Sequence, residues 1–210
     1  MTLDPFYLIV DSAAWIERLV PLGVKLVQLR IKDRLPAEIR ADLRRAKAVC
    51  AAHGCQLIVN DYWQIAIEED CDFIHLGQED LADADLDAIR KAGLKLGLST
   101  HDRAELATAL AASPDYIALG PIYPTVLKAM AWAPQGLERI GQWKAELGDI
   151  PLVAIGGLTV ARIAGAFENG ADSAAVVTDI TRNPDPESRT LEWIRATRDR
   201  FPTDRCGMGS

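Results

Sequence analysis

The chain has 210 residues, with 30 acidic and 23 basic side chains and a formal net charge of −7. Apolar residues make up 49% and charged residues 25%, which is typical of a globular protein and argues against a disordered one. An acidic chain is poorly suited to general nucleic-acid binding, which needs a basic face, and the sequence has no apolar run of membrane-spanning length. We therefore expect neither a nucleic acid nor a membrane as a partner.

The cysteines and the N-terminal residues indicate where the protein works. Cys50, Cys55, Cys71 and Cys206 form no Cys-x-x-Cys pair and have no histidine at zinc-ligand spacing. Residues 1–10 lack the basic start and the long apolar stretch of a secretory signal. Both observations favour a cytoplasmic protein with reduced thiols.

Apolar runs typical of β-strands alternate along the chain with segments of helical character. The predicted strands are Phe6–Val10, Val24–Arg30, Gln56–Asn60, Phe73–Leu76, Lys95–Ser99, Tyr116–Gly120, Pro151–Ile155 and Ser173–Val177. The predicted helices are Ala13–Leu22, Pro36–His53, Trp63–Asp70, Leu86–Ala92, Arg103–Ala111, Gly136–Leu147, Arg162–Asn169 and Glu187–Arg200.

Strands that alternate with helices build βαβ units and a parallel sheet, and eight such units predict a closed (β/α)₈ TIM barrel of the α/β class. An open, doubly wound sheet is the structural alternative, although it usually has fewer strands. The length fits one domain, so we expect residues 1–202 to form the barrel and residues 203–210 to form a frayed tail. The expected helix caps include Ser12 and either Thr100 or Asp102.

The second strand carries two cations on one face. In a TIM barrel the chemistry lies at the carboxyl ends of the strands and in the loops that follow them. Because side chains alternate along a strand, Gln28, Arg30 and Lys32 point into the barrel mouth, while the apolar residues between them face the helices. Inward cations need an anionic partner, and an Arg–Lys pair suits phosphate. The alternative is a structural ion pair with Asp33 or another carboxylate.

Acidic residues follow the next two strands. The third strand ends at Asn60-Asp61, and Asp80 follows the fourth. Carboxylates at adjacent strand ends can share a hard cation, and Mg²⁺ usually takes one or two carboxylates together with substrate phosphates. A carboxylate pair beside an Arg–Lys pair therefore suits a magnesium–pyrophosphate complex. The alternative for Asp80 is the N-cap of a helix over residues 81–92.

The remaining strand ends offer hydroxyl groups, a lysine and glycines. His75 lies inside the fourth strand, where it either faces a substrate or is a hydrogen-bonded core histidine, and Ser99 ends the fifth strand. The loops after strands seven and eight form the usual phosphate site of these barrels, where backbone N–H groups face the anion. The candidates for binding a second anion after strands six, seven and eight are Thr125, Lys128, Gly156, Gly157, Val177 and Thr178.

Taken together and in this order, the strand-end segments resemble the thiamine-phosphate synthase family, also called thiamine-phosphate pyrophosphorylases. The matching segments are Gln28–Lys32, Ile58–Asp61, Ile74–Asp80, Gly97–His101, Asp115–Thr125, Val153–Gly157 and Gly170–Asp172. One such motif is weak, but the ordered set is specific and runs from about residue 24 to about residue 180.

The resemblance implies an enzyme that joins hydroxymethylpyrimidine diphosphate to a thiazole phosphate, with Mg²⁺ as cofactor. The products are thiamine phosphate and pyrophosphate, formed by a dissociative route through a pyrimidine-methyl cation. By the same resemblance, Arg30 and Lys32 bind the diphosphate, Asp61 and Asp80 ligate Mg²⁺, Asn60 and Gln28 serve the pyrimidine pocket, Ser99 and Lys128 contact the leaving pyrophosphate, and Thr125, Gly157, Val177 and Thr178 receive the thiazole phosphate.

Two departures from the family pattern keep other functions open. Leu127 replaces the second hydroxyl of the usual Thr-x-Thr-Lys loop, and Asp179 places an anion near the proposed phosphate. The alternatives are a non-catalytic paralogue that binds thiamine phosphates, a thiazole tautomerase, which would not need the two metal carboxylates, and a different phosphate-binding barrel such as an isomerase. The oligomeric state stays open, with a homo-oligomer among the alternatives.

Overall fold

The computed structural model describes residues 2–125 and 133–198, and eight parallel strands in this part of the chain close into one barrel. Each strand pairs with the next in sequence, and β8 closes the ring by pairing with β1, which confirms the (β/α)₈ barrel and excludes the open sheet. The strands are β1 (Phe6–Val10), β2 (Leu26–Leu29), β3 (Gln56–Asn60), β4 (Phe73–Leu76), β5 (Lys95–Thr100), β6 (Tyr116–Leu119), β7 (Leu152–Ile155) and β8 (Ser173–Val176).

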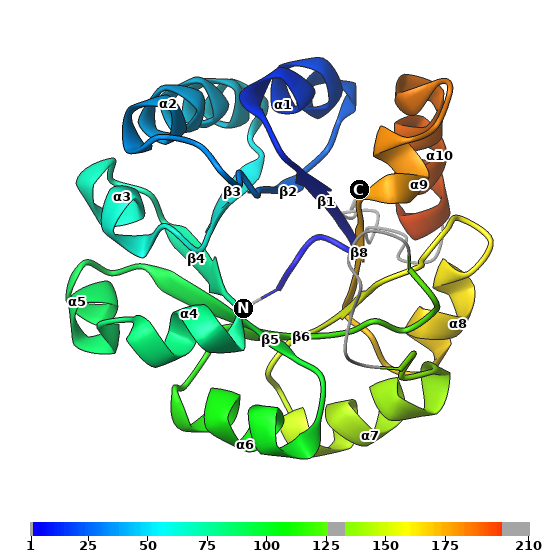
Figure 1. Ribbon diagram of the computed structural model, residues 1–210. Coiled ribbons are helices and arrows are strands. Elements are labelled where there is room, and N and C mark those ends of the chain that lie inside the picture. The colour runs from blue at the N-terminus through cyan, green and yellow to red at the C-terminus, as the bar shows by residue number, and fades with distance from the viewer. Residues whose placement is uncertain (1, 126–132, 199–210) are drawn as a thin grey trace, which may run out of the picture.

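The helices form an outer ring around the strands, as Figure 1 shows in a view along the barrel axis. They are α1 (Ala13–Leu19), the 3₁₀ turn η1 (Val20–Leu22), α2 (Pro36–His53), α3 (Trp63–Glu68), α4 (Gln78–Asp83), α5 (Leu86–Lys91), α6 (Arg103–Ala111), α7 (Leu137–Leu147), α8 (Ile163–Glu168), α9 (Thr178–Thr181) and α10 (Pro186–Arg198). Residues 203–210, the predicted tail, lie outside the described residues.

Three local predictions need correction. The sequence pattern did not predict α4 and α9, which have six and four residues. The helix predicted over Ala13–Leu22 divides into α1 and η1, because Pro21 cannot supply the N–H that would continue the α-helix. Ser12 precedes α1 but accepts no capping hydrogen bond, whereas the Asp102 carboxylate accepts one from the Glu105 N–H at 2.9 Å.

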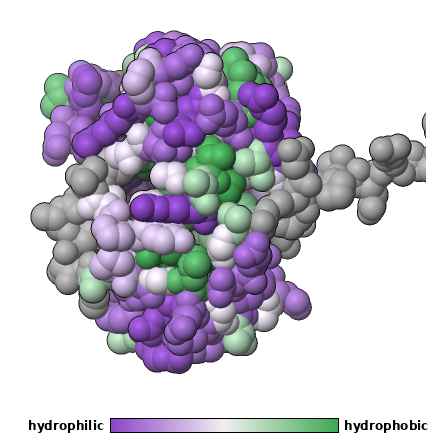
Figure 2. All heavy atoms as spheres, turned by 90° about the vertical axis from the view of Figure 1, so that its right-hand side faces the viewer, coloured by the Kyte–Doolittle hydropathy of each residue, from purple (hydrophilic) through white to green (hydrophobic). Residues whose placement is uncertain are grey.

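The barrel has two apolar layers. The larger one lies between the strands and the helices and includes Val27, Leu29 and Ile31, as the alternation along β2 predicts. The smaller one fills the barrel interior and includes Tyr7 and Tyr116. Seen from the side of α8 and α10, the outer surface is mainly hydrophilic (Figure 2).

One glycine makes the interior packing possible. A Cβ atom at Gly97 of β5 would lie 2.2 Å from the ring of Tyr116 on the neighbouring strand β6. No side chain fits at that distance, so Gly97 provides the space that the Tyr116 ring fills.

Three of the four cysteines are described, and these lie away from the carboxyl ends of the strands. Cys50, Cys55 and Cys71 are free, buried thiols around a cavity of about 420 Å³ near the amino end of β3, and Cys206 lies outside the described residues. Lys47, which also lines this cavity, donates to the backbone carbonyl of Asp70 at 2.8 Å. In the part of the chain that the structure describes, no helix is long and apolar enough to cross a membrane.

Candidate active site at the carboxyl ends of the strands

The end of β2 delivers two cations to the barrel mouth. The Lys32 ammonium forms an ion pair with the Asp61 carboxylate at the end of β3, so its carboxylate partner is Asp61 and not Asp33. Arg30 forms no hydrogen bond or ion pair through its side chain with the residues described. Its charge helps to lower the pKa of His75, which places the guanidinium near the end of β4. The structure thus leaves Arg30 available to an anion.

Two carboxylates meet beside Lys32. Asp61 follows β3 with a left-handed backbone (φ 65°), a conformation that aspartate tolerates better than most residues. Asp80 is the third residue of α4, and its carboxylate accepts a hydrogen bond from the Gly77 N–H. Burial and then the negative charge of Asp61 raise the pKa of Asp80, while Lys32 opposes the shift. The two carboxylates are therefore neighbours whose charges repel each other.

Asp80 is not the helix N-cap that the alternative interpretation required. Gly77 occupies the N-cap of α4, and Asp85 caps α5 by accepting a hydrogen bond from the Ala88 N–H at 2.9 Å. The turn of α4 was missing from the sequence-based assignment, and it places Asp80 in the first turn of that helix, beside Asp61.

The carboxylate pair fits a hard divalent cation. Mg²⁺ neutralises neighbouring negative charges and accepts one or two carboxylates together with phosphate oxygens and water. Among residues 2–125 and 133–198, no group of three His, Cys, Asp or Glu side chains could hold a metal ion. A cation held by Asp61 and Asp80 would therefore need oxygens from a substrate or from water to complete its coordination.

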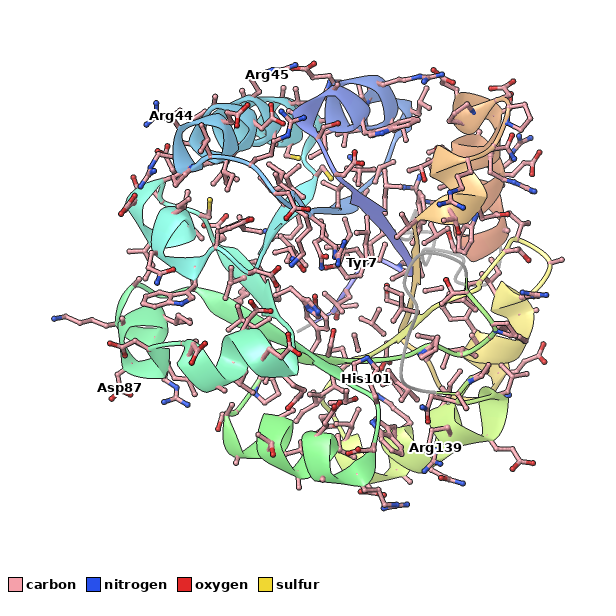
Figure 3. All side chains as sticks on the ribbon, viewed as in Figure 1. Tyr7, Arg44, Arg45, Asp87, His101 and Arg139 are labelled. Carbon is pink, nitrogen blue, oxygen red and sulfur yellow. The ribbon has the colours of Figure 1, made fainter. Side chains whose placement is uncertain are left out.

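A row of five hydrogen-bonded polar side chains crosses the barrel interior beneath these charges. The Gln28 amide donates to the Tyr7 hydroxyl at 2.8 Å, and the Tyr7 and Tyr116 hydroxyls lie 2.9 Å apart. The Tyr116 oxygen lies 2.7 Å from Nδ1 of His75, and Nε2 of His75 lies 2.8 Å from Oγ of Ser99. We call these five side chains the interior row. Figure 3 shows Tyr7 inside the ring of strands, whereas Arg44 and Arg45 of α2 lie at the periphery of the molecule, outside the helix layer.

His75 is a buried histidine whose two ring nitrogens are both engaged by protein side chains. Burial lowers its pKa to about 4, with a further lowering by Arg30 and an opposing effect of Asp61. The ring is therefore neutral at neutral pH. Of the two interpretations of this residue, the structure shows the hydrogen-bonded interior histidine, and Ser99 lies between its ring and the mouth of the barrel.

The remaining inward residues at this level complete the floor of the site. Asn60 is buried at the end of β3, directly beside His75 in the strand register. The Gln78 amide of α4 donates to the backbone carbonyl of Ser99 at 2.7 Å, which ties the start of α4 to the end of β5. Gln28, Asn60, His75 and Ser99 are thus brought together, as the strand-end argument predicts.

The second half of the mouth is shaped by close backbone contacts. The loop after β6 pairs with the end of β7: the Tyr123 N–H donates to the Gly156 carbonyl at 3.0 Å. A Cβ at Gly156 would lie 2.6 Å from Pro121, and one at Gly157 would lie 2.7 Å from the Tyr123 side chain. Both glycines also have positive φ angles, so the packing of this loop requires them whether or not a phosphate binds there.

The predictions for binding a second anion after β6 and after β8 also concern this half of the mouth. Thr125 is the last described residue before the gap, and Lys128 and Leu127 lie outside the described residues. Thr178 begins α9 directly after Val177, so both residues lie at the end of β8 as predicted. None of these placements tests their role in binding.

Asp179 does not place its charge in the mouth, contrary to the expectation from the sequence. Its carboxylate accepts a hydrogen bond from the Trp193 indole N–H at 2.7 Å and lies 3.4 Å from Nε of Arg189, both on α10. The short helix α9 turns the side chain toward the helix layer. The departure from the family pattern at this position therefore belongs to packing between α9 and α10.

Sequence reasoning missed Tyr7, Tyr116, Gln78 and Arg162 as residues around the site. Tyr7 and Tyr116 occur in apolar strand segments, where tyrosine is indistinguishable from a packing residue. Arg162 lies over the ring of Tyr123, 4.6 Å from its centroid, and donates to the Gly157 carbonyl at 2.7 Å. The one available signal was the inward parity of Tyr7 and Tyr116 along their strands.

Comparison with known proteins shows which family the chain resembles. The family model described as thiamine monophosphate synthase matches residues 6–180. A protein of Rhizobium etli named thiamine-phosphate synthase is 72% identical over 197 residues, which cover 94% of this chain and 97% of that protein. One of Escherichia coli O139:H28 with the same name is 50% identical and covers 90% of this chain and 89% of its own length.

The fold agrees as well. The solved structure described as a thiamine phosphate pyrophosphorylase from Pyrococcus furiosus superposes with a TM-score of 0.83 at 22% identity, covering 94% of this chain and 97% of that one. At that identity the likeness shows the barrel, and the family rests on the sequence matches. The chain belongs to the thiamine monophosphate synthase family, whose members are transferases.

Proposed function

We propose that the protein is a thiamine-phosphate synthase, which condenses hydroxymethylpyrimidine diphosphate with a thiazole phosphate to give thiamine phosphate and pyrophosphate. The observation that carries the proposal is the meeting of Asp61, Asp80 and Lys32 at adjacent strand ends, with Arg30 unpaired among the described residues. This set of charges suits a diphosphate and a divalent cation, and family membership supplies the reaction.

The diphosphate half of the site is the reacting half. In the proposed dissociative route the C–O bond to the diphosphate breaks, and pyrophosphate leaves with the electron pair. Arg30, Lys32 and the Ser99 hydroxyl, together with Lys128 from the loop after β6, bind the leaving group. Because negative charge grows on the pyrophosphate as the bond breaks, these groups bind the transition state more tightly than the substrate.

Asp61 and Asp80 are the residues that would hold Mg²⁺. Bound there, Mg²⁺ supplies charge neutralisation to the diphosphate and so makes it a better leaving group. Lys32 pairs with Asp61 and, on its flexible stem, stays within reach of a phosphate oxygen, so it also neutralises charge at this end of the site.

The two organic groups are held on opposite sides of the mouth. Asn60 and Gln28, at the ends of β3 and β2, serve the pyrimidine. The thiazole phosphate binds at the ends of β6, β7 and β8, through Thr125, Gly156, Gly157, Val177 and Thr178. The thiazole nitrogen attacks the pyrimidine-methyl cation with its own lone pair, so no general base is required, and orientation of the two bound reactants supplies the remaining rate increase.

The test is to incubate the purified protein with both substrates and follow thiamine phosphate and pyrophosphate, with Mg²⁺ and with a chelator. We expect equal amounts of both products with Mg²⁺ and little of either with chelator. Binding of thiamine phosphate without turnover would instead identify a non-catalytic paralogue. Isomerisation of the thiazole phosphate alone would identify a tautomerase, and product formation that a chelator leaves unchanged would overturn the metal assignment.

A further inference from the structure

We propose that Tyr7 and Tyr116 are positioning residues that act through His75 to aim the hydroxyl proton of Ser99 at the substrate diphosphate. The inference rests on the proposed function, because it gives that proton a phosphate acceptor. It adds two residues from the barrel interior to the machinery of the reaction, together with a defined tautomer of His75.

The direction of the hydrogen bonds begins at Gln28. Its amide nitrogen can only donate, so the Tyr7 oxygen, 2.8 Å away, accepts. The Tyr7 proton then has the Tyr116 oxygen as its acceptor, at 2.9 Å. Tyr116 in turn has one proton, and the acceptor that remains for this proton in the interior row is Nδ1 of His75, at 2.7 Å. Each hydroxyl therefore accepts from one side and donates to the other.

The same logic sets the tautomer of His75. Since Nδ1 accepts the proton from Tyr116, the ring is neutral and carries its own proton on Nε2. Nε2 lies 2.8 Å from Ser99 Oγ, so this nitrogen donates and the serine oxygen accepts. The Ser99 proton is then used by no member of the interior row. Ser99 ends the row at the carboxyl end of β5, so its hydroxyl is free to donate to a phosphate oxygen in the mouth.

The reverse direction is unfavourable in this interior. If Ser99 donated to His75 and His75 donated to Tyr116, the Tyr7 hydroxyl would receive a donor from each side and its own proton would have no acceptor in the row. Tyr7 and Tyr116 are almost completely buried. A buried hydroxyl without an acceptor costs free energy, because it has lost its hydrogen bond to water and gained none in the protein. The orientation of the Gln28 amide thus decides which way the serine proton points.

Packing holds the rings independently of their hydroxyls. The ring of Tyr116 stacks on His75 with centroids 5.5 Å apart and meets the Tyr7 ring edge-on at 6.1 Å, and Gly97 provides the space for it. Tyr116→Phe therefore removes the proton donor to His75 and keeps the shape that fills the barrel. Tyr7→Phe is the second variant, which interrupts the row one step further from Ser99.

The test reads the tautomer directly by ¹⁵N NMR of histidine-labelled protein, which has three histidines to assign. In the wild-type protein we expect His75 with the proton on Nε2 and a bare Nδ1. In Tyr116→Phe we expect a mixture that includes the Nδ1–H tautomer, and a kcat that falls roughly tenfold, the equivalent of one hydrogen bond to a charged acceptor. Tyr7→Phe should shift the tautomer in the same direction but less.

A double variant and a matched control separate positioning from packing. In a Ser99→Ala background, Tyr116→Phe should cost almost nothing further in kcat, because the tyrosine acts through the serine. Ser173→Ala also removes one buried hydroxyl, which donates to the Asp4 carbonyl at 2.8 Å and, among the described residues, makes no hydrogen bond with the row, so it should leave the tautomer and kcat unchanged.

A wild-type His75 protonated on Nδ1 or on both nitrogens would overturn the proposal, whatever the activity. Losses of kcat that simply multiply in the double variant, with an unchanged tautomer, would overturn it as well and leave the tyrosine a packing residue. If the wild-type protein forms no thiamine phosphate, the proposed function fails instead, and the nitrogen spectra still report the tautomer.

Discussion

Asp80 combines an energetic cost to the folded state with a proposed function in binding a cation. Its pKa is raised by burial and by Asp61, so the ionised carboxyl destabilises the folded state. A carboxyl whose pKa is higher in the folded than in the unfolded chain lowers the stability of the fold at any pH above its unfolded pKa. Protonation of the carboxyl removes this loss of stability. Under the proposed function, binding of a cation between the two carboxylates would compensate this cost.

We therefore expect Asp80→Asn to fold at least as stably as wild type without metal, while losing the stabilisation that Mg²⁺ with pyrophosphate gives to the wild-type protein. The asparagine oxygen can still accept from the Gly77 N–H, so the start of α4 is kept. Thermal unfolding with and without Mg²⁺ and pyrophosphate checks this. A variant that unfolds without metal would show instead that Asp80 is needed for the helix.

Gly97 is a second residue whose role the structure defines. Gly97→Ala should destabilise the barrel by about 1–3 kcal/mol, since the added methyl group overlaps the Tyr116 ring. The matched control is Gly141→Ala inside α7, where the nearest atom to a new Cβ is 3.7 Å away and alanine is the better helix former, so stability should hold or rise. Urea unfolding of both variants compares them. Equal stabilities would contradict the packing argument.

At the scale of whole elements, two helix starts form a matched pair. Asp102 accepts a capping hydrogen bond at the start of α6, whereas Ser12 accepts none at α1. Asp102→Ala should cost about 1 kcal/mol of stability, and Ser12→Ala should cost less than about 0.5 kcal/mol. Chemical denaturation measures both. A larger loss for Ser12 than for Asp102 would show that the caps had been assigned the wrong way round.

The elements also show how far a sequence can be interpreted. All eight strands could be predicted because each is a short apolar run between turn residues, and the longer helices followed from their periodicity. Helices α4 and α9 could not, since six and four residues are too few to show a period. Those short helices decide where Asp80 and Asp179 point, so the missing elements were the ones that mattered to the site.

The contacts within the site divide in the same way. The Lys32–Asp61 pair follows from strand ends that meet at one edge of the barrel, and strand parity places Gln28, Asn60 and Ser99 inward. The interior row depends on which residues of β1 and β6 face each other across the barrel interior, and no local sequence pattern contains that information. A tyrosine in an apolar strand segment also cannot be distinguished from a packing residue by sequence, so the hydrogen-bond partner of its hydroxyl is known only from the structure.

At the scale of the whole molecule, the neutral interior predicts a response to acid. The folded pKa of His75 is about 4, below the usual 6.5, so the unfolded chain binds the proton first. With respect to this histidine, the protein therefore has its full stability above pH 6.5 and loses stability as the pH falls from 6.5 to about 4. The total loss from this histidine is about 3 kcal/mol. The relief of Asp80 by protonation opposes it.

Urea unfolding at several pH values measures this response. We expect stability to fall between pH 6.5 and 4 in the wild-type protein and to fall less steeply in His75→Gln, which has no imidazole to titrate. An equally steep fall in both proteins would show that His75 does not control the acid response.

The whole molecule is acidic, and both proposed substrates are anions, so its overall charge does not attract them. Under the proposed function, substrate binding depends on a few local charges at one end of the barrel. The most direct test compares thiamine phosphate and pyrophosphate formation by the wild-type protein with that by an Asp61→Asn, Asp80→Asn double variant, in Mg²⁺ and with equal folded fractions checked by circular dichroism. We expect equal amounts of both products from the wild-type protein and at least a 100-fold slower rate from the variant. A folded double variant that works at the wild-type rate would contradict the assignment of the site.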